Sequence, residues 1–163
     1  MTVTLALEPD RRIDEVHPVR RPGNNPKRRV AATNVLSQRE RTKLAEVVRY
    51  KASGHHKRNP GDYGLERTNP RPTKSLCDNV RVVTLAEATA LLKRGVTSGV
   101  FSDFRYGMFP KFIWCVDQTG EAYEARTDAR NPGEYHGYRL EEDDDMRSHI
   151  VSVWKKRCRK VGK

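Results

Sequence analysis

Apolar residues recur every three or four positions in three segments of the chain, which is the pattern of an amphipathic helix. In the first segment, Ser37 and Glu40 have the spacing of a capping box, and Gly54 is a typical helix stop. The second segment begins at Thr84 with the same spacing and is expected to end before Gly95. We therefore predict helices over 37–52, 84–94 and 143–158.

The third helix is preceded by five consecutive carboxylates at 141–145 and ends in a run of Lys and Arg. Acidic residues at the start of a helix and basic residues at its end both complement the helix macrodipole. The acidic run is therefore explained by helix structure. We expect no metal site there, because a contiguous run rarely provides convergent ligands.

Alternating apolar residues predict a β-hairpin over 111–127. The connector Asp117–Gly120 is typical of a type I turn closed by a glycine in the left-handed region. Both faces of the first strand are apolar, so we expect it to be central in a sheet and covered on two sides. A third strand is predicted at 134–140, and a short one at 79–83.

Together these elements predict an α+β fold, with a small three-stranded, mostly antiparallel sheet flanked by three helices. The sheet and helices would form one domain over 35–160, with a loop at 55–72 marked by Pro, Gly and Asn. Residues 1–34 contain no aromatic side chain and are rich in Pro, Asn and Arg. We expect them to form a flexible basic arm.

The basic residues are concentrated at the two ends of the chain. The formal net charge is +11; residues 1–74 contain 17 Lys and Arg against 8 Asp and Glu, and the last nine residues add six basic ones. Such a distribution attracts polyanions, and we expect a nucleic-acid partner, with RNA favoured over DNA. The alternative is a solvated basic tail that only keeps the protein in solution.

Several classes of protein lack support in the sequence. No apolar run approaches about 18 residues and no secretory signal is recognisable, so we expect a cytoplasmic protein without a membrane partner. The three cysteines are odd in number and widely spaced, without a C-x-x-C pair. This argues against disulfides and structural zinc. Phosphate-binding and dinucleotide-binding glycine motifs are also absent, and we expect no metal and no cofactor.

Four short sequences occur in a fixed order: HHKRNPGDYGL at 55–65, KSLCD at 74–78, IWCVDQTGEAYEAR at 113–126 and EYHGYRL at 134–140. With them, the segment 50–155 resembles a group of small bacterial proteins for which no activity is known. In that group a proline often follows the second tyrosine of the last motif, where this chain has Arg139. The resemblance implies a single domain and no particular chemistry.

The candidate chemistry is centred on His55, His56 and His136. Imidazole exchanges protons near neutral pH, and fixed cations stabilise charge that develops on a phosphate. Histidines with nearby cations are thus what metal-independent RNA cleavage needs, and these three are the predicted catalytic residues. The side chains predicted to hold the phosphate or contact bases are Lys57, Arg58, Tyr63, Arg105, Lys111, Tyr135, Tyr138 and Arg139.

The sequence leaves three functions open. The first is a metal-independent ribonuclease of toxin type, and the second is a noncatalytic nucleic-acid-binding module. The third is a protein-interaction factor, such as an antitoxin or an inhibitor of a defence system. The residues also permit purely structural roles, because adjacent histidines do not face one another. His136 can equally be a satisfied histidine beside the hairpin. Cys77 is a possible nucleophile, although a lone cysteine is more often buried.

Overall fold

The computed structural model describes residues 25–52 and 81–158. Its elements in chain order are the 3-10 helix η1 (Pro26–Arg28), α1 (Gln38–Val47), β1 (Arg49–Tyr50), α2 (Leu85–Thr97), β2 (Arg105–Tyr106), β3 (Phe109–Pro110), β4 (Phe112–Val116), β5 (Ala122–Arg126), β6 (Glu134–Arg139) and α3 (Asp145–Cys158).

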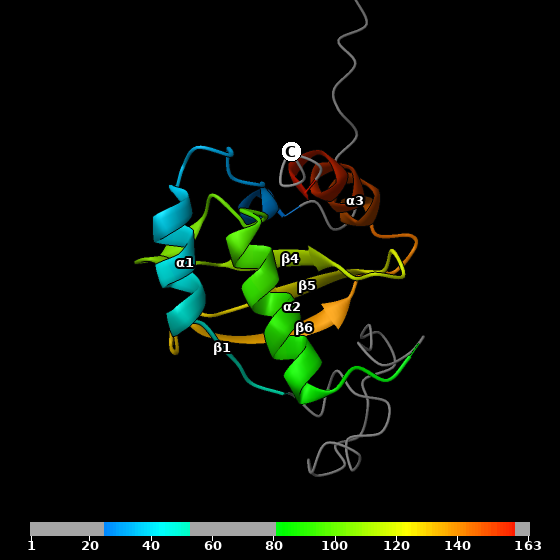
Figure 1. Cartoon of the computed structure of the whole chain (residues 1–163), viewed down its shortest axis with the longest axis horizontal. Coiled ribbons are helices and arrows are strands. Elements are labelled where there is room, and N and C mark those ends of the chain that lie inside the picture. The colour runs from blue at the N-terminus through cyan, green and yellow to red at the C-terminus, as the bar shows by residue number, and fades with distance from the viewer. Residues whose placement is uncertain (1–24, 53–80, 159–163) are drawn as a thin grey trace, which may run out of the picture.

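The main sheet has four strands in the order β1-β6-β5-β4, and β2 and β3 form a separate two-stranded sheet. Only β1 runs parallel to its neighbour. α1 and α2 lie together over one face of the main sheet, whereas α3 packs on the other (Figure 1). The predicted α+β class with three flanking helices is confirmed. The predicted count of three strands is wrong, because β1 and the small sheet are too short to produce an alternating pattern.

α1 begins where the sequence predicts. Ser37 Oγ accepts a hydrogen bond from Glu40 N at 3.2 Å, and Glu40 Oε2 accepts one from Ser37 N at 2.7 Å. The predicted end at residue 52 is wrong, because the helix stops at Val47 and the chain turns into the sheet. There Arg49 N donates to Gly133 O at 2.9 Å. Gly54, the expected stop, lies outside the described residues.

α2 is longer than predicted. Thr84 Oγ1 caps it by accepting a hydrogen bond from Glu87 N at 3.1 Å. The predicted end before Gly95 is wrong, since the helix runs to Thr97 and reverses at Gly99, which has φ +72°. Gly95 instead allows close packing, because a Cβ there would lie 2.5 Å from Trp114 O.

The predicted hairpin is confirmed as β4 and β5, and the third predicted strand as β6. Gly120 has φ +90° and its N–H donates to Asp117 O at 3.1 Å, as the predicted turn requires. β4 is buried on both faces but is the last strand of the sheet rather than a central one. Its outer edge is covered by the segment 100–102, where Trp114 N donates to Val100 O at 2.9 Å.

Residues 25–34 were expected to belong to the flexible arm, and this expectation is wrong. Ala31 is completely buried and its N–H donates to Phe101 O at 2.8 Å. Arg28 forms ion pairs with Glu124 and Asp144. The segment is fixed against the rest of the fold because its few apolar and cationic side chains contact residues that are distant in sequence.

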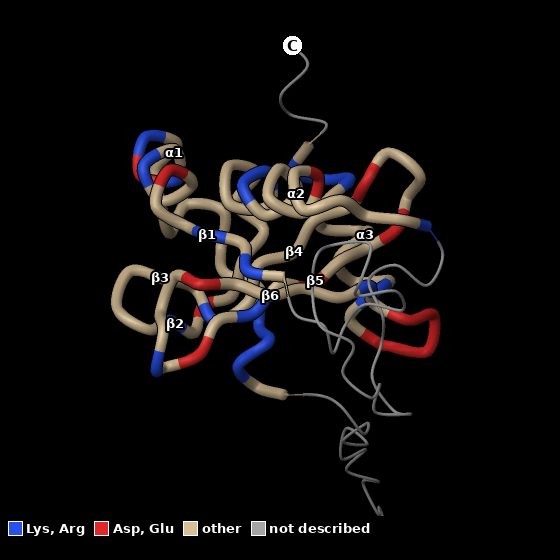
Figure 2. The backbone as a smooth tube through the Cα atoms, turned by 90° about the horizontal axis from the view of Figure 1, so that it is seen from below, with Lys and Arg blue, Asp and Glu red and all other residues tan. Residues whose placement is uncertain are grey.

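Two further predictions are corrected around the helices. Residues 81–83 are not a strand; Val83 enters the core, while Arg81 binds Glu87 and Asp117. The acidic residues between β6 and α3 (Figure 2) do more than complement a dipole, since Asp144 pairs with Arg28. α3 begins two residues later than predicted. No helix among the described residues is long and apolar enough to span a bilayer.

Candidate functional site

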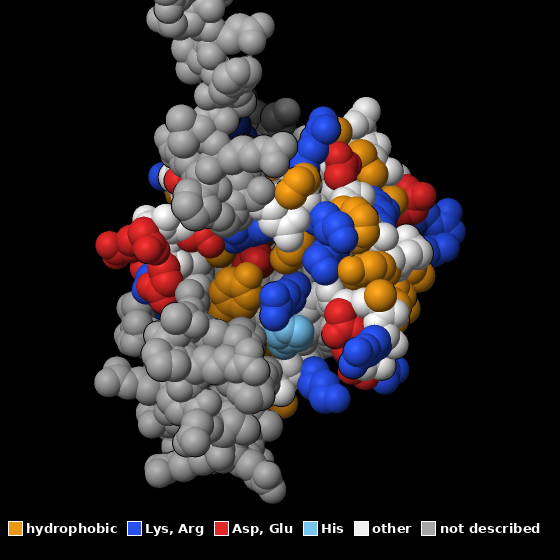
Figure 3. All heavy atoms as spheres, turned by 180° about the vertical axis from the view of Figure 1, so that it is seen from behind, with side chains coloured by type: hydrophobic (Ala, Val, Ile, Leu, Met, Phe, Trp, Pro, Cys, Tyr) orange, Lys and Arg blue, Asp and Glu red, His pale blue; other side chains and the backbone are white. Residues whose placement is uncertain are grey.

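His136 lies on β6 directly opposite Arg126 on β5. Its neighbour Tyr135 packs in the core with α1 and α2, so strand alternation turns His136 to the opposite face of the sheet. There Arg126 Nε donates a hydrogen bond to His136 Nε2 at 3.1 Å. Figure 3 shows this face, with Lys and Arg side chains gathered around a histidine. A half-exposed imidazole and an exposed guanidinium are thus held side by side.

This hydrogen bond identifies the acceptor nitrogen of the ring. Since arginine can only donate, Nε2 of His136 accepts the hydrogen bond with its lone pair. Nε2 is therefore the nitrogen that can accept a proton. Arg126 covers it in this arrangement, and a phosphate that drew the guanidinium away would uncover it.

An open pocket of about 260 Å³ lies beside His136. Lys51 and Ala52 approach it from the end of β1, and Asp128 and Asn131 from the loop after β5. Hydrogen bonds from the backbone N–H groups of Asn131 and Arg130 lower the pKa of Asp128. The pocket therefore combines a carboxylate, an imidazole and an ammonium group.

The parallel pairing of β1 with β6 brings the chain before residue 53 to this pocket. Tyr50 is in register with Tyr135, and Lys51 N donates to Tyr135 O at 2.7 Å. Ala52, the last described residue before the gap, also lines the pocket. The predicted site residues His55, His56, Lys57, Arg58 and Tyr63 lie outside the described residues, as does Cys77.

Two of the predicted binding residues are buried, and these predictions are wrong. Tyr135 is completely buried and its hydroxyl donates to Pro110 O at 2.5 Å, so its ring cannot stack on a base. The side chain of Arg139 is 6% exposed and is paired with Glu121 and Glu141. Its guanidinium therefore faces these two carboxylates and not solvent.

Tyr138 is half-buried, and its hydroxyl donates to Glu124 Oε1. Burial and the neighbouring carboxylate of Glu124 raise the pKa of Tyr138 above its ordinary value. The hydroxyl is thus engaged inside the protein. Only the exposed part of the ring remains for contact with a base.

Arg105 and Lys111 are half-buried, and each lies against an aromatic ring. The Arg105 guanidinium is 5.4 Å from the Phe101 ring centre, and Lys111 Nζ is 5.1 Å from that of Tyr106. Lys27 lies 4.5 Å over the ring centre of Phe104 in the same region. We call Lys27, Phe104, Tyr106 and Lys111 the basic-aromatic ribbon. Its rings and cations are of the kinds that stack bases and bind phosphates.

Arg126, Asp128 and Lys51 were not identified from the sequence. Arg126 ends the return strand of the hairpin, but its pairing with His136 depends on the register between β5 and β6. The loop 127–133 sets that register, and its length alone does not reveal it. The sequence pattern predicts a helix that includes Lys51, and a helical Lys51 would not be expected to lie beside β6.

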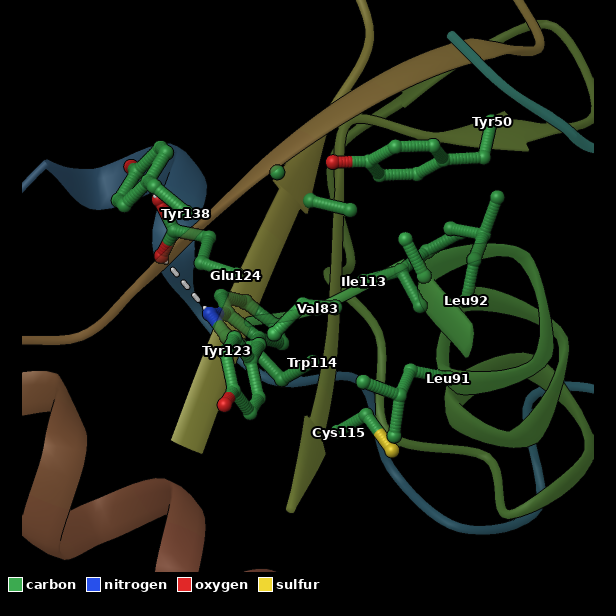
Figure 4. Close-up of a pocket in the computed structure, with 13 residues that line it drawn as sticks. Tyr50, Val83, Leu91, Leu92, Ile113, Trp114, Cys115, Tyr123, Glu124 and Tyr138 are labelled. Carbon is green, nitrogen blue, oxygen red and sulfur yellow. Dashed lines mark hydrogen bonds between the residues drawn. The ribbon is translucent and has the colours of Figure 1, made fainter. Parts of the chain in front are cut away.

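A second, apolar cavity lies between α2 and the sheet (Figure 4). Leu91 and Leu92 point from α2 toward Ile113 and Cys115 on β4. The cavity is small, about 30 Å³, and apolar side chains make up most of its lining. We interpret it as a packing void.

Other chemistry finds no support among the described residues. Burial raises the pKa of Cys115 to about 12, so its thiol is not a nucleophile at neutral pH. Within residues 25–52 and 81–158, no group of three His, Cys, Asp or Glu side chains is arranged to hold a metal ion.

Comparison of the whole chain with protein-family models, with curated proteins and with solved structures gives no match. Its function must therefore be argued from the site itself, in which His136, Arg126 and the end of β1 meet.

Proposed function

We propose that the protein is an RNA-directed, metal-independent ribonuclease in which His136 transfers a proton. The observation that carries the proposal is the pairing of β1 with β6. It brings Lys51 and Ala52, the last described residues before His55 and His56, to the pocket that His136 lines. These are the three histidines that the sequence singles out.

Covalent geometry limits how far the other two histidines can lie from the pocket. A chain extends by at most about 3.6 Å per residue, so the Cα atom of His55 is within roughly 11 Å of that of Ala52. Ala52 lines the pocket that contains His136. A phosphodiester group between His136 and one of the two histidines fits such a separation.

The proposed reaction is cleavage by the neighbouring 2′-hydroxyl group. His136 Nε2 takes the 2′-hydroxyl proton, the 2′-oxygen attacks phosphorus, and the bond from phosphorus to the 5′-oxygen breaks. His55 or His56, in the protonated form, gives a proton to the departing 5′-oxygen. Arg126 moves from His136 to the phosphate and stabilises its negative charge, which also uncovers Nε2.

The test is cleavage of a fluorescent RNA oligomer by the purified full chain in EDTA. We expect products with a 2′,3′-cyclic phosphate. We expect no cleavage at the phosphate that follows a 2′-deoxy nucleotide, because that nucleotide has no 2′-hydroxyl group to attack it. His136→Ala should lower the rate by about 100-fold or more, as expected for loss of a proton-transfer group. His149→Ala is the matched control, because His149 is an exposed histidine on α3 outside the pocket.

The outcome that contradicts the proposal is equally definite. If the pure protein leaves RNA intact, or if His136→Ala and His149→Ala cleave alike, His136 is not a catalytic residue. The same comparison for His55→Ala and His56→Ala identifies which of them gives the second proton.

A second candidate, noncatalytic RNA binding, is favoured by the basic-aromatic ribbon. Cations lie over both Phe104 and Tyr106, and these rings are half-exposed. On this alternative, RNA stays intact but binds with an affinity that falls steeply as salt rises. Lys27→Ala and Lys111→Ala should then each weaken binding, whereas Lys93→Ala, at an exposed position on α2, should not. A protein that neither cleaves nor binds RNA would leave the protein-interaction function.

A further inference from the structure

A groove of about 720 Å³ lies where the start of α1 meets the ends of α2 and α3. These three helix ends lie together along one side of the molecule, at the top of Figure 1. The groove shares no lining residue with the His136 pocket. Its described lining contains no acidic residue and includes three basic ones together with polar side chains: Arg41, Lys156, Arg157, Gln38, Thr97 and Ser98.

The two arginines converge on Gly99, which lies two residues after the end of α2. Arg41 lies so close that a Cβ on Gly99 would be 2.4 Å from Arg41 Nη1. Arg157 donates from Nη1 to the carbonyl oxygen of Gly99 and from Nη2 to Ala31 O, the latter at 2.8 Å. Two guanidinium groups from different helices are thus packed against one residue.

Neither guanidinium is paired with a carboxylate among the described residues. Within the described part of the chain, Arg157 donates to two carbonyl oxygens, and Arg41 Nε is buried with no hydrogen-bond partner. Burial lowers the pKa of Arg157, and the positive charge of Arg41 lowers it further. The end of α2 supplies about half a negative charge, which is less than the charge of either arginine. No acidic side chain of the described residues in the lining therefore compensates the positive charge of the groove.

We propose that this groove binds a phosphate group. A tetrahedral oxyanion can accept hydrogen bonds from guanidinium groups in their planar fork geometry, and Lys156 at the rim adds a further charge. The hydroxyls of Thr97 and Ser98 lie in the same lining and can contact its remaining oxygens. A volume of this size also accommodates a nucleotide. The phosphate can belong to RNA or to a free nucleotide, and both sources share this recognition chemistry.

The first experiment titrates the full chain with pyrophosphate at constant ionic strength and measures binding by calorimetry. Arg41→Gln should weaken binding about tenfold or more, as expected for loss of a charge-assisted hydrogen bond. Lys156→Gln should weaken it by a smaller factor. Arg39→Gln is the matched control, since Arg39 is exposed on α1 and does not line the groove, and it should bind as the wild type does.

A readout without ligand separates binding from folding. Because Arg41 repels Arg157 and has an unpartnered buried nitrogen, Arg41→Gln should melt at or above the temperature of the wild type in phosphate-free buffer. If it fails to fold, Lys156→Gln carries the test, because Lys156 is exposed. The proposal is overturned if pyrophosphate binds no better than chloride, or if Arg41→Gln and Lys156→Gln both bind it like the wild type.

The sources of phosphate are separated by competition. If an RNA oligomer displaces pyrophosphate from the wild type, and the oligomer binds Arg41→Gln more weakly, the groove binds the RNA backbone. If only a mononucleotide displaces pyrophosphate, the groove binds a free nucleotide. The titration is repeated with a His136→Ala, Arg126→Gln double variant, which removes the proposed catalytic pair. If this variant still binds pyrophosphate, phosphate binding in the groove does not depend on His136 and Arg126. Failure of the ribonuclease proposal would then not contradict the proposed phosphate site.

Discussion

Arg28 Nη2 lies 2.8 Å from Glu124 Oε2, and this ion pair connects the segment before α1 to the middle of the sheet. Glu124 is completely buried, and its carboxylate also accepts hydrogen bonds from Trp114 Nε1, at 2.8 Å, and from the hydroxyl of Tyr138. Arg28 in turn reaches Asp144 at 2.9 Å, just before α3. One buried carboxylate thus links both ends of the described fold.

Glu124→Gln should lower the free energy of unfolding by about 3 kcal/mol, because it removes the fully buried partner of Arg28 and leaves the guanidinium only the more exposed carboxylate of Asp144. Urea unfolding monitored by tryptophan fluorescence measures the change. The control is Glu142→Gln, an exposed acid in the turn before α3, which should change stability by less than about 0.5 kcal/mol. Equal stability of both variants would contradict a stabilising role for Glu124.

Asp117 should make the protein sensitive to acid. Burial opposes its ionisation, but hydrogen bonds from Thr119 and Arg81 outweigh this and lower the pKa of Asp117 to about 2, from an ordinary value of 3.8. A lowered pKa stabilises the fold above the unfolded pKa, so stability should be complete above about pH 5 and be lost as pH falls toward 2.

The expected contribution of Asp117 is about 2 kcal/mol, because its side chain is only 3% exposed and is little screened by solvent. Asp117→Asn should therefore lose stability at pH 7 and show a flatter dependence between pH 5 and pH 2. Asp143→Asn, at an exposed acid, should keep the slope of the wild type. An unchanged slope in Asp117→Asn would refute the assignment.

Gly95→Ala should destabilise the protein although alanine is the better helix former. The added Cβ would lie 2.5 Å from Trp114 O, which is backbone and cannot move aside. We expect a loss of about 2 kcal/mol, typical of overpacking. Ala90→Gly on the exposed side of α2 tests helix propensity alone and should cost about 1 kcal/mol. Stabilisation by Gly95→Ala would show that the helix can move away from β4.

Cys115 should not react with a thiol reagent at pH 8 while the protein is folded, because it is buried and its pKa is raised to about 12. In Cys115→Ser, the number of thiols that react in the native protein should be the same as in the wild type. After unfolding in guanidinium, the variant should react with one equivalent less. Loss of a native reactive thiol in Cys115→Ser would contradict burial.

The candidate site was predictable only in part. His136 and its strand follow from the alternation of EYHGYR, since neighbouring strand residues point to opposite faces. The same pattern does not reveal whether the hydroxyl group of Tyr135 lies in solvent or donates a hydrogen bond to a buried carbonyl oxygen. Only the position of Pro110, 25 residues earlier in the chain, decides this.

The sequence by itself determined the elements whose stabilising contacts are local. The cap of α1 at Ser37, the turn closed by Gly120 and the pairing of β4 with β5 all join residues close in the chain, so short patterns specify them. Only the tertiary structure decided that Arg28 binds Glu124, that β1 joins β6 and that Arg41 meets Arg157 at Gly99. These contacts join residues tens of positions apart, and their energies depend on burial and charge that exist only once the chain has folded.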